Sequence, residues 1–208
     1  MISNKQLKDH LDFPDKVESI IRSGKYNKLF GFTNFSLCEL EYDNLLLSIM
    51  ECDNKIIIKH VIDNIICINT FNTFGIRMIH YLTCLNDVKL FNYFVNKYFF
   101  DLETQTNNKA KPIHFACQNG NLEIIEFLVN RNVDLESRGF GSTPIDFIYG
   151  HGQFYTIRKI LSKKIAAASQ NIFRNAHRVK YLLACNDELT LEQREELVNI
   201  IDDVRQYD

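Results

Sequence analysis

The side chains best suited to metal or redox chemistry in this sequence are six cysteines. They are Cys38, Cys52, Cys67, Cys84, Cys117 and Cys185, so that 13 or more residues separate each neighbouring pair. Zinc and dithiol sites need cysteines about two to four residues apart. The spacing therefore argues against a zinc finger or a redox pair. We expect free thiols that behave as small apolar side chains in a reducing compartment.

Histidines are the next candidates, as general bases or metal ligands. Neither His80 nor His114 belongs to the H-x3–5-H pair of a zinc site. His177 and Cys185 lie eight residues apart and could form a thiolate–imidazole pair if the fold brought them together. No glycine loop that could form an oxyanion hole lies near them. We therefore expect no catalytic residue, no metal site and no cofactor, and predict that the chain is not an enzyme.

A glycine-rich stretch, Gly139-Phe140-Gly141-Ser142-Thr143, could in principle cradle a phosphate through its backbone amides. It lacks the lysine and the spacing of a P-loop and the third glycine of a dinucleotide-binding fingerprint, and no strand-like run precedes it. We therefore expect it to form a tight turn and not an anion site.

Net charge and composition narrow the class of protein. The chain has 208 residues with 24 Lys and Arg against 26 Asp and Glu, a formal net charge of -2 and a pI near 6.3. Because nucleic-acid binders normally carry a basic face, we expect no nucleic-acid partner. The N-terminus lacks the apolar run of a secretory signal, and no stretch reaches the roughly 18 to 20 apolar residues of a membrane helix. We expect a soluble, cytoplasmic monomer that binds no membrane.

The elements that position these residues follow from an apolar pattern that returns along the chain. It occupies residues 54–62, 87–95, 121–129 and 153–161, at spacings of 33, 34 and 32 residues. Each copy has apolar residues at helical intervals, for example Ile125, Leu128 and Val129. A second short apolar stretch precedes each copy, at residues 45–49, 79–82, 113–117 and 145–148, and turn residues separate the two. The pattern predicts four helix-turn-helix units.

Helices this short cannot bury their apolar faces alone, so the units must stack on one another. The sequence therefore predicts an all-α solenoid with degenerate helical caps, because the end units meet water on one side. We expect an N-terminal cap in residues 1–40, four repeats in residues 41–161 and a C-terminal helical cap in residues 162–208. Thr190 and Gln193 have the spacing of a capping box that begins the last helix.

Further residues recur at fixed places in these units. The third copy has Lys111-Pro112-Ile113-His114-Phe115-Ala116 with Gly120, the fourth has Thr143-Pro144-Ile145-Asp146 with Gly152, and the second has Met78-Ile79-His80 with Gly75. They resemble the ankyrin repeat, whose signature is T-P-L-H-x-A at a period of 33 residues. The resemblance covers about residues 40–161 and implies an ankyrin-repeat solenoid. Asp146 stands where the family has histidine, and Met78 stands where it has proline.

The resemblance also assigns roles to side chains. It implies that His80 and His114 are structural groups that tie one finger loop, the hairpin before each first helix, to the next. It implies a concave binding face made of fingers and first helices. Carrying the family's variable surface positions onto this sequence gives a set of candidate partner-binding residues. They are Thr73, Phe74, Ile76, Leu85, Asn107, Asn108, Gln118, Asn119, Arg138, Phe140 and His151.

Proteins that resemble this one are interaction modules, so we expect a non-enzymatic adaptor or inhibitor that holds a partner protein on its concave face. Exposed Phe74 and Phe140 would anchor the interface. One alternative is an adaptor that recruits a ubiquitin ligase, and another is an effector with unrecognised activity in the C-terminal helices. Within those helices a basic stretch, from Lys163 to Lys180, precedes an acidic one, and either could dock a partner or simply face solvent.

The abundance of Asn and Ile, about a tenth of the chain each, suggests an AT-rich genome. Among ankyrin proteins this composition resembles those of giant viruses of amoebae and of intracellular bacteria. A viral or bacterial effector in host cytosol is therefore one interpretation of the sequence.

Overall fold

The computed structural model describes residues 13–31, 43–52, 54–65, 68, 71–85, 87–150, 158, 180–181, 183–187 and 189–205. Within these residues the regular structure is helical, and β-type pairing is limited to two isolated bridges, Phe71 with Arg77 and Gly139 with Ser142. The prediction of an all-α fold is confirmed. The chain forms two compact units, residues 1–85 with 89–100 (unit 1) and residues 86–88 with 101–208 (unit 2).

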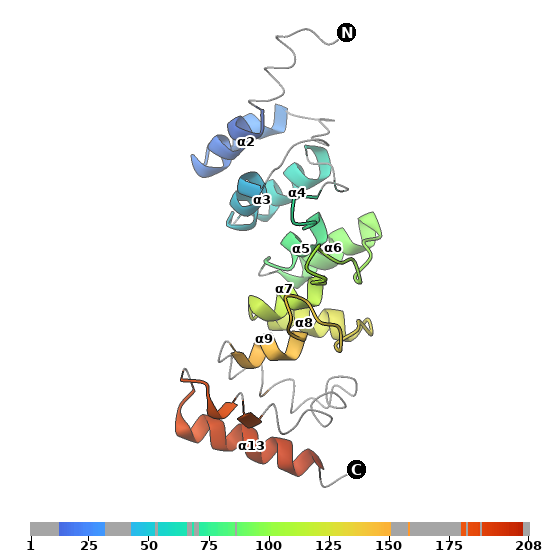
Figure 1. Cartoon of the computed structure of the whole chain (residues 1–208). Coiled ribbons are helices and arrows are strands. Elements are labelled where there is room, and N and C mark those ends of the chain that lie inside the picture. Colours follow the sequence, from blue (N-terminus) through green and yellow to red (C-terminus); the bar gives the residue numbers. More distant parts are fainter. Residues whose placement is uncertain are drawn as a thin grey trace. The chain divides into compact units, whose positions relative to one another are not determined.

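Unit 1 contains α2 (Phe13–Arg22), the 3-10 helix η1 (Tyr26–Gly31), α3 (Asp43–Met50), α4 (Lys55–Asn64), α5 (Met78–Leu82) and α6 (Val88–Tyr98). Helix α2 packs on η1 and α3, and α3 packs in turn on α4 and α5 (Figure 1). The predicted stripe of α4 is buried at Ile58, Val61 and Ile62, which are at most 3% exposed. These apolar contacts between successive helices form the core of the unit.

Helix α4 begins where the sequence provides a cap. The side chain of Asn54 accepts hydrogen bonds from the backbone N–H groups of Ile56 and Ile57 at 3.1 and 3.3 Å. The first N–H groups of a helix lack the usual partner four residues earlier, so the cap stabilises the first turn by about 1 kcal/mol.

Unit 2 contains α7 (Pro112–Gln118), α8 (Leu122–Val129), α9 (Pro144–Gly150) and α13 (Leu191–Arg205). Helix α7 packs on both α8 and α9 (Figure 1). Gly120 adopts a φ of 67° in the turn between α7 and α8, a conformation that glycine reaches without steric cost. Ile125, Leu128 and Val129 of α8 are all buried, as the periodicity predicts.

The eight predicted helices can be compared with those observed. Helices α3, α5, α7 and α9 match the predicted first helices, and α4, α6 and α8 match three of the second helices. The fourth, at residues 153–161, lies outside the described residues except for Arg158, which is helical. The predicted capping box is present at α13, since Thr190 Oγ1 accepts from Gln193 N at 3.2 Å and Gln193 Oε1 accepts from Thr190 N at 3.0 Å. None of the described helices is long and apolar enough to cross a bilayer.

Candidate functional site

Three finger loops precede first helices in the described part of the chain. We name them finger 1 (residues 71–77), finger 2 (104–110) and finger 3 (137–143). Each closes on a backbone hydrogen bond, from Asn72 N to Ile76 O at 3.1 Å, from Thr106 N to Ala110 O at 2.9 Å, and from Gly139 N to Ser142 O at 2.9 Å. Each tip also contains a residue with positive φ, as a tight turn requires. The glycine-rich stretch is thus a hairpin turn, as predicted.

His114 joins α7 to finger 3. Its Nδ1 accepts a hydrogen bond from Lys111 N at 3.1 Å, so its Nε2 carries the proton and donates to Ser137 O at 3.0 Å. Burial lowers the pKa of His114, and the ring is neutral at physiological pH. His80 repeats the first of these contacts, accepting from Arg77 N at 3.0 Å. The structural role expected for His114 is confirmed, and its nitrogens are committed to the backbone.

Fingers 2 and 3 are in direct contact. Phe140 N donates to Asn108 O at 3.1 Å. A Cβ atom on Gly139 would lie 2.5 Å from Ala110 Cα and 2.9 Å from His114 Cδ2, closer than real Cβ contacts come. Only glycine therefore allows the two backbones to approach this closely. The two tips form one continuous surface in unit 2.

An aromatic cluster lies on this surface, made by Phe115 of α7, Phe140 of finger 3 and Phe147 of α9. Phe140 meets the other two rings edge to face, with centroid distances of 5.8 Å to Phe115 and 6.3 Å to Phe147. Even so, 46% of Phe140 is exposed. An edge-to-face arrangement is favourable for aromatic rings and holds Phe140 in place. The cluster thus combines an ordered ring with accessible apolar surface.

A comparison with family models identifies part of this region. Residues 96–148 match the model described as ankyrin repeats (many copies). These residues are ankyrin repeats. Comparison with curated proteins gave no match. Ankyrin repeats are generally protein–protein interaction modules and are typically not enzymes. The match includes fingers 2 and 3 and both aromatic residues of the first helices, so the surface just described belongs to the ankyrin segment.

The expected partner-binding residues fall into three groups. The exposed ones are Thr73, Phe74, Asn107, Asn108, Gln118, Asn119, Arg138 and Phe140. Ile76 is half-buried, and His151 lies outside the described residues. Leu85 is only 3% exposed, so the expectation that it faces a partner is corrected. Leu85 lies just after the five-residue helix α5, and its apolar side chain is part of the buried core of unit 1.

The structure brings part of this set together. Finger 2 contributes Asn107 and Asn108, and finger 3 contributes Arg138 and Phe140, on one surface of unit 2. The sequence analysis missed Phe115 and Phe147. Both occupy the variable x position of the T-P-L-H-x-A signature in their ankyrin repeats, so the repeat register carried a signal that could have found them.

Finger 1 of unit 1 presents aromatic residues in a different way. Phe71 and Phe74 are 61% and 60% exposed. The side chain of buried Asn72 braces the loop, because its Oδ1 accepts from Phe74 N at 3.0 Å and from Ile76 N at 2.9 Å. Arg77 lies over the Phe71 ring at 4.8 Å. Phe74 makes no ring contact among the described residues.

Two clusters of ionisable side chains link residues that are far apart in the sequence. In unit 2, Lys111 is 6% exposed, and its Nζ pairs with Asp134 Oδ2 at 2.9 Å and with Glu103. Burial opposes the charge of Lys111, but the two carboxylates keep its pKa above the usual value. In unit 1, Asp63 accepts from Tyr93 at 2.9 Å and from Tyr98 at 2.7 Å. Burial of Tyr98 and its hydrogen bond to Asp63 raise the pKa of Tyr98 to about 12.

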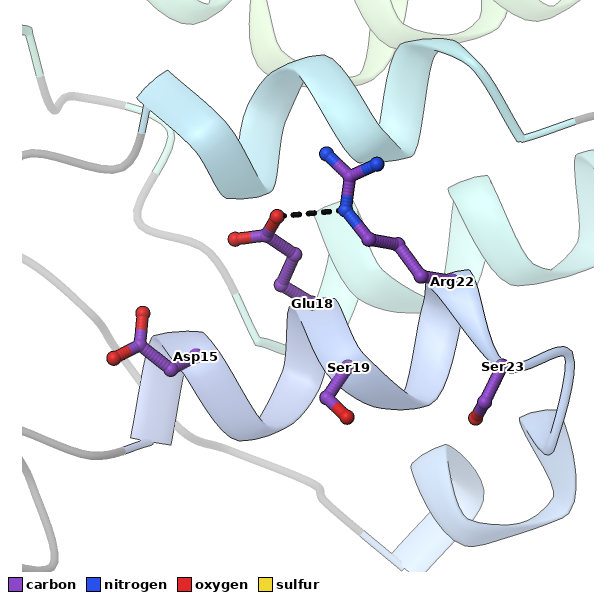
Figure 2. A pocket seen from close by; sticks show the side chains of 5 residues that line it. All are labelled: Asp15, Glu18, Ser19, Arg22 and Ser23. Carbon is purple, nitrogen blue, oxygen red and sulfur yellow. Dashed lines mark hydrogen bonds and ion pairs between the residues drawn. The ribbon is translucent and has the colours of Figure 1, made fainter.

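Little else in the described part of the chain suggests chemistry. Figure 2 shows a pocket beside α2 whose lining comes from one helix and the turn after it, with an ion pair of 2.8 Å between Arg22 Nε and Glu18 Oε1. Among the described residues, no group of three or more His, Cys, Asp and Glu could hold a metal. Cys52, Cys84, Cys117 and Cys185 are free thiols, and burial raises the pKa of Cys117. His177 and the basic stretch before Lys180 lie outside the described residues.

Proposed function

We propose that this chain is a non-enzymatic adaptor or inhibitor that binds a partner protein through fingers 2 and 3 and the first helices behind them. The observation that supports this most directly is the aromatic cluster. Phe140 is 46% exposed and yet held by two neighbouring rings. A rigid, partly exposed aromatic side chain loses little conformational freedom on binding, and such residues commonly dominate interface energies.

The polar residues around the aromatic cluster could form the solvent-accessible edge of a protein interface. Asn107, Asn108 and Arg138 are exposed on the same two fingers and offer hydrogen-bond donors and acceptors. Interfaces commonly combine an apolar centre with a polar, solvent-accessible edge. The free thiols of the described cysteines fit a reducing compartment, so we place this binding in the cytosol.

A capture experiment tests the proposal. The full chain carrying an affinity tag is incubated with native cytosol, and bound proteins are quantified by mass spectrometry for the wild type and for Phe140→Asp. We expect the substitution to remove specific partners, because it places a charge in the apolar centre of the interface.

Phe99→Asp is the matched control. Phe99 also has a φ of 52°, as Phe140 does, and it is 89% exposed, but it follows α6 and belongs to no finger. Phe99→Asp should unfold in urea at the wild-type midpoint, and Phe140→Asp at a slightly lower one because it loses two ring contacts, so both are folded in the capture experiment. Equal capture by the wild type, Phe140→Asp and Phe99→Asp would contradict the proposed binding surface.

A further inference from the structure

The positively charged side chains in the described part of unit 2 differ in whether they have partners. Most are engaged: Lys111 with Asp134 and Glu103, Arg158 with Glu196, Lys180 with Asp202, Arg131 over the Phe127 ring, and Arg194 with backbone carbonyl groups. Lys109 and Arg138 are exposed and have no partner among the described residues. These two cations therefore remain available to a ligand.

Both available cations belong to fingers that touch, Lys109 near the tip of finger 2 and Arg138 at the base of finger 3. Lys109 is in finger 2, next to Asn108, whose carbonyl oxygen accepts the 3.1 Å bond from Phe140 N. Arg138 is in finger 3, two residues before Phe140. The two fingers that meet beside the aromatic cluster therefore each carry one exposed cation.

The described carboxylates of the same region form no ion pair with either cation. Glu103 and Asp134 are both held by the buried Lys111. Glu136 is exposed two residues before Arg138, and no ion pair joins them in the described part of the chain. Each of the two fingers thus presents one exposed cation that forms no ion pair in the described part of the chain, beside an apolar surface.

We infer that this surface binds an acidic peptide segment of the partner protein, in which an apolar side chain lies between carboxylates. The inference rests on the proposed function and specifies the chemistry of the partner. The apolar side chain packs against the aromatic cluster, and the carboxylates pair with Lys109 and Arg138. Charge complementarity of this kind sets specificity and speeds association.

A peptide selection supplies the probe. The full chain is used to select binders from a random peptide library, and enriched peptides are synthesised with a fluorescent label for anisotropy measurements. We expect selected peptides to carry Asp or Glu on both sides of Leu, Ile or Phe. Their binding should weaken as salt rises from low to high ionic strength, because exposed charges are screened.

Charge reversal then tests the two cations. Lys109→Glu with Arg138→Glu should weaken binding of the selected peptides at least about tenfold and should favour versions in which Lys replaces the acidic residues. Lys25→Glu with Lys28→Glu is the control, since it changes net charge equally at two exposed residues of unit 1. Both double variants should keep the wild-type urea midpoint.

The outcomes separate this inference from the proposed function. If Phe140→Asp abolishes peptide binding while reversal of Lys109 and Arg138 changes it no more than the control does, the binding surface stands and the acidic specificity is overturned. Selection of neutral or basic peptides by the wild type would overturn it as well. Competition by an unstructured oligothymidylate would assign the charges to nucleic acid instead. If none of these variants alters binding, both proposals fail.

Discussion

Finger 1 and finger 3 each carry a phenylalanine at corresponding positions, but the two rings have different surroundings. Phe74 is 60% exposed and meets no other ring among the described residues. Phe140 is 46% exposed and rests on Phe115 and Phe147. The same position of the repeat thus supplies an unsupported ring in one unit and an ordered ring in the other. Exposure alone would rank Phe74 as the better contact, whereas the cost of ordering a side chain favours Phe140.

The largest effect should come from removing the histidine that holds finger 3. We expect His114→Ala to lower the free energy of unfolding by about 2 to 4 kcal/mol, because it leaves a cavity and two unpaired backbone groups. Asp146, at the same repeat position, accepts from Thr143 N at 2.9 Å and is half-buried. Asp146→Ala should cost about 1 kcal/mol, as the loss of a helix cap does. Urea unfolding measures both, and equal costs would contradict the role given to His114.

Replacing a glycine by alanine should destabilise finger 3 and finger 1 for different physical reasons. Gly139→Ala should cost about 1 to 3 kcal/mol, because the new methyl group would overlap the backbone of Ala110. Gly75→Ala in finger 1 should cost about 1 kcal/mol, because its φ of 74° is unfavourable for alanine. Gly141 is the control for backbone strain in finger 3, since it has a φ of 85° and a methyl group added there would meet no atom within 4 Å. A Gly139→Ala variant no less stable than Gly141→Ala would show that the fingers can separate without cost.

We expect a phenylalanine that packs against other rings to contribute more to binding affinity than a more exposed one without such contacts. Once a partner is identified, Phe140→Ala should weaken its affinity by about tenfold, and Phe74→Ala by about threefold or less. Phe115→Ala should also weaken binding, since it removes a ring that orders Phe140. Isothermal titration calorimetry measures these affinities. A larger loss for Phe74→Ala than for Phe140→Ala would reverse the ranking of the two fingers.

The smallest effect concerns pH. Burial lowers the pKa of His114, so the unfolded chain takes up a proton near pH 6.5 while the folded chain resists it. The stability that neutral His114 contributes is therefore complete above that pH and is lost as the pH falls below it. Between about pH 7.5 and 5.5 the wild type should lose more stability than His114→Asn. Parallel urea curves for the two proteins over this window would contradict the prediction.

The sequence allowed the helices to be predicted because each apolar stripe must face the neighbouring pair. The surface was harder to predict. Leu85 and Asn119 occupy the same repeat position, but the apolar side chain is buried and the polar one stays exposed. The aromatic cluster depends on the φ of 52° at Phe140 and on the contact between fingers 2 and 3, which no periodicity encodes. The family register could have identified Phe115 and Phe147, but not their meeting with Phe140.

The close approach of Gly139 to Ala110 also limits how this surface can evolve. Residues at the base of finger 3 cannot grow larger without separating it from finger 2. Variation in specificity must therefore arise beyond this contact, through replacement of Phe140 or insertion beside Gly141 at the tip, or through replacement of the exposed Arg138. A designer who wished to redirect the protein to another ligand would leave the base unchanged and randomise those positions.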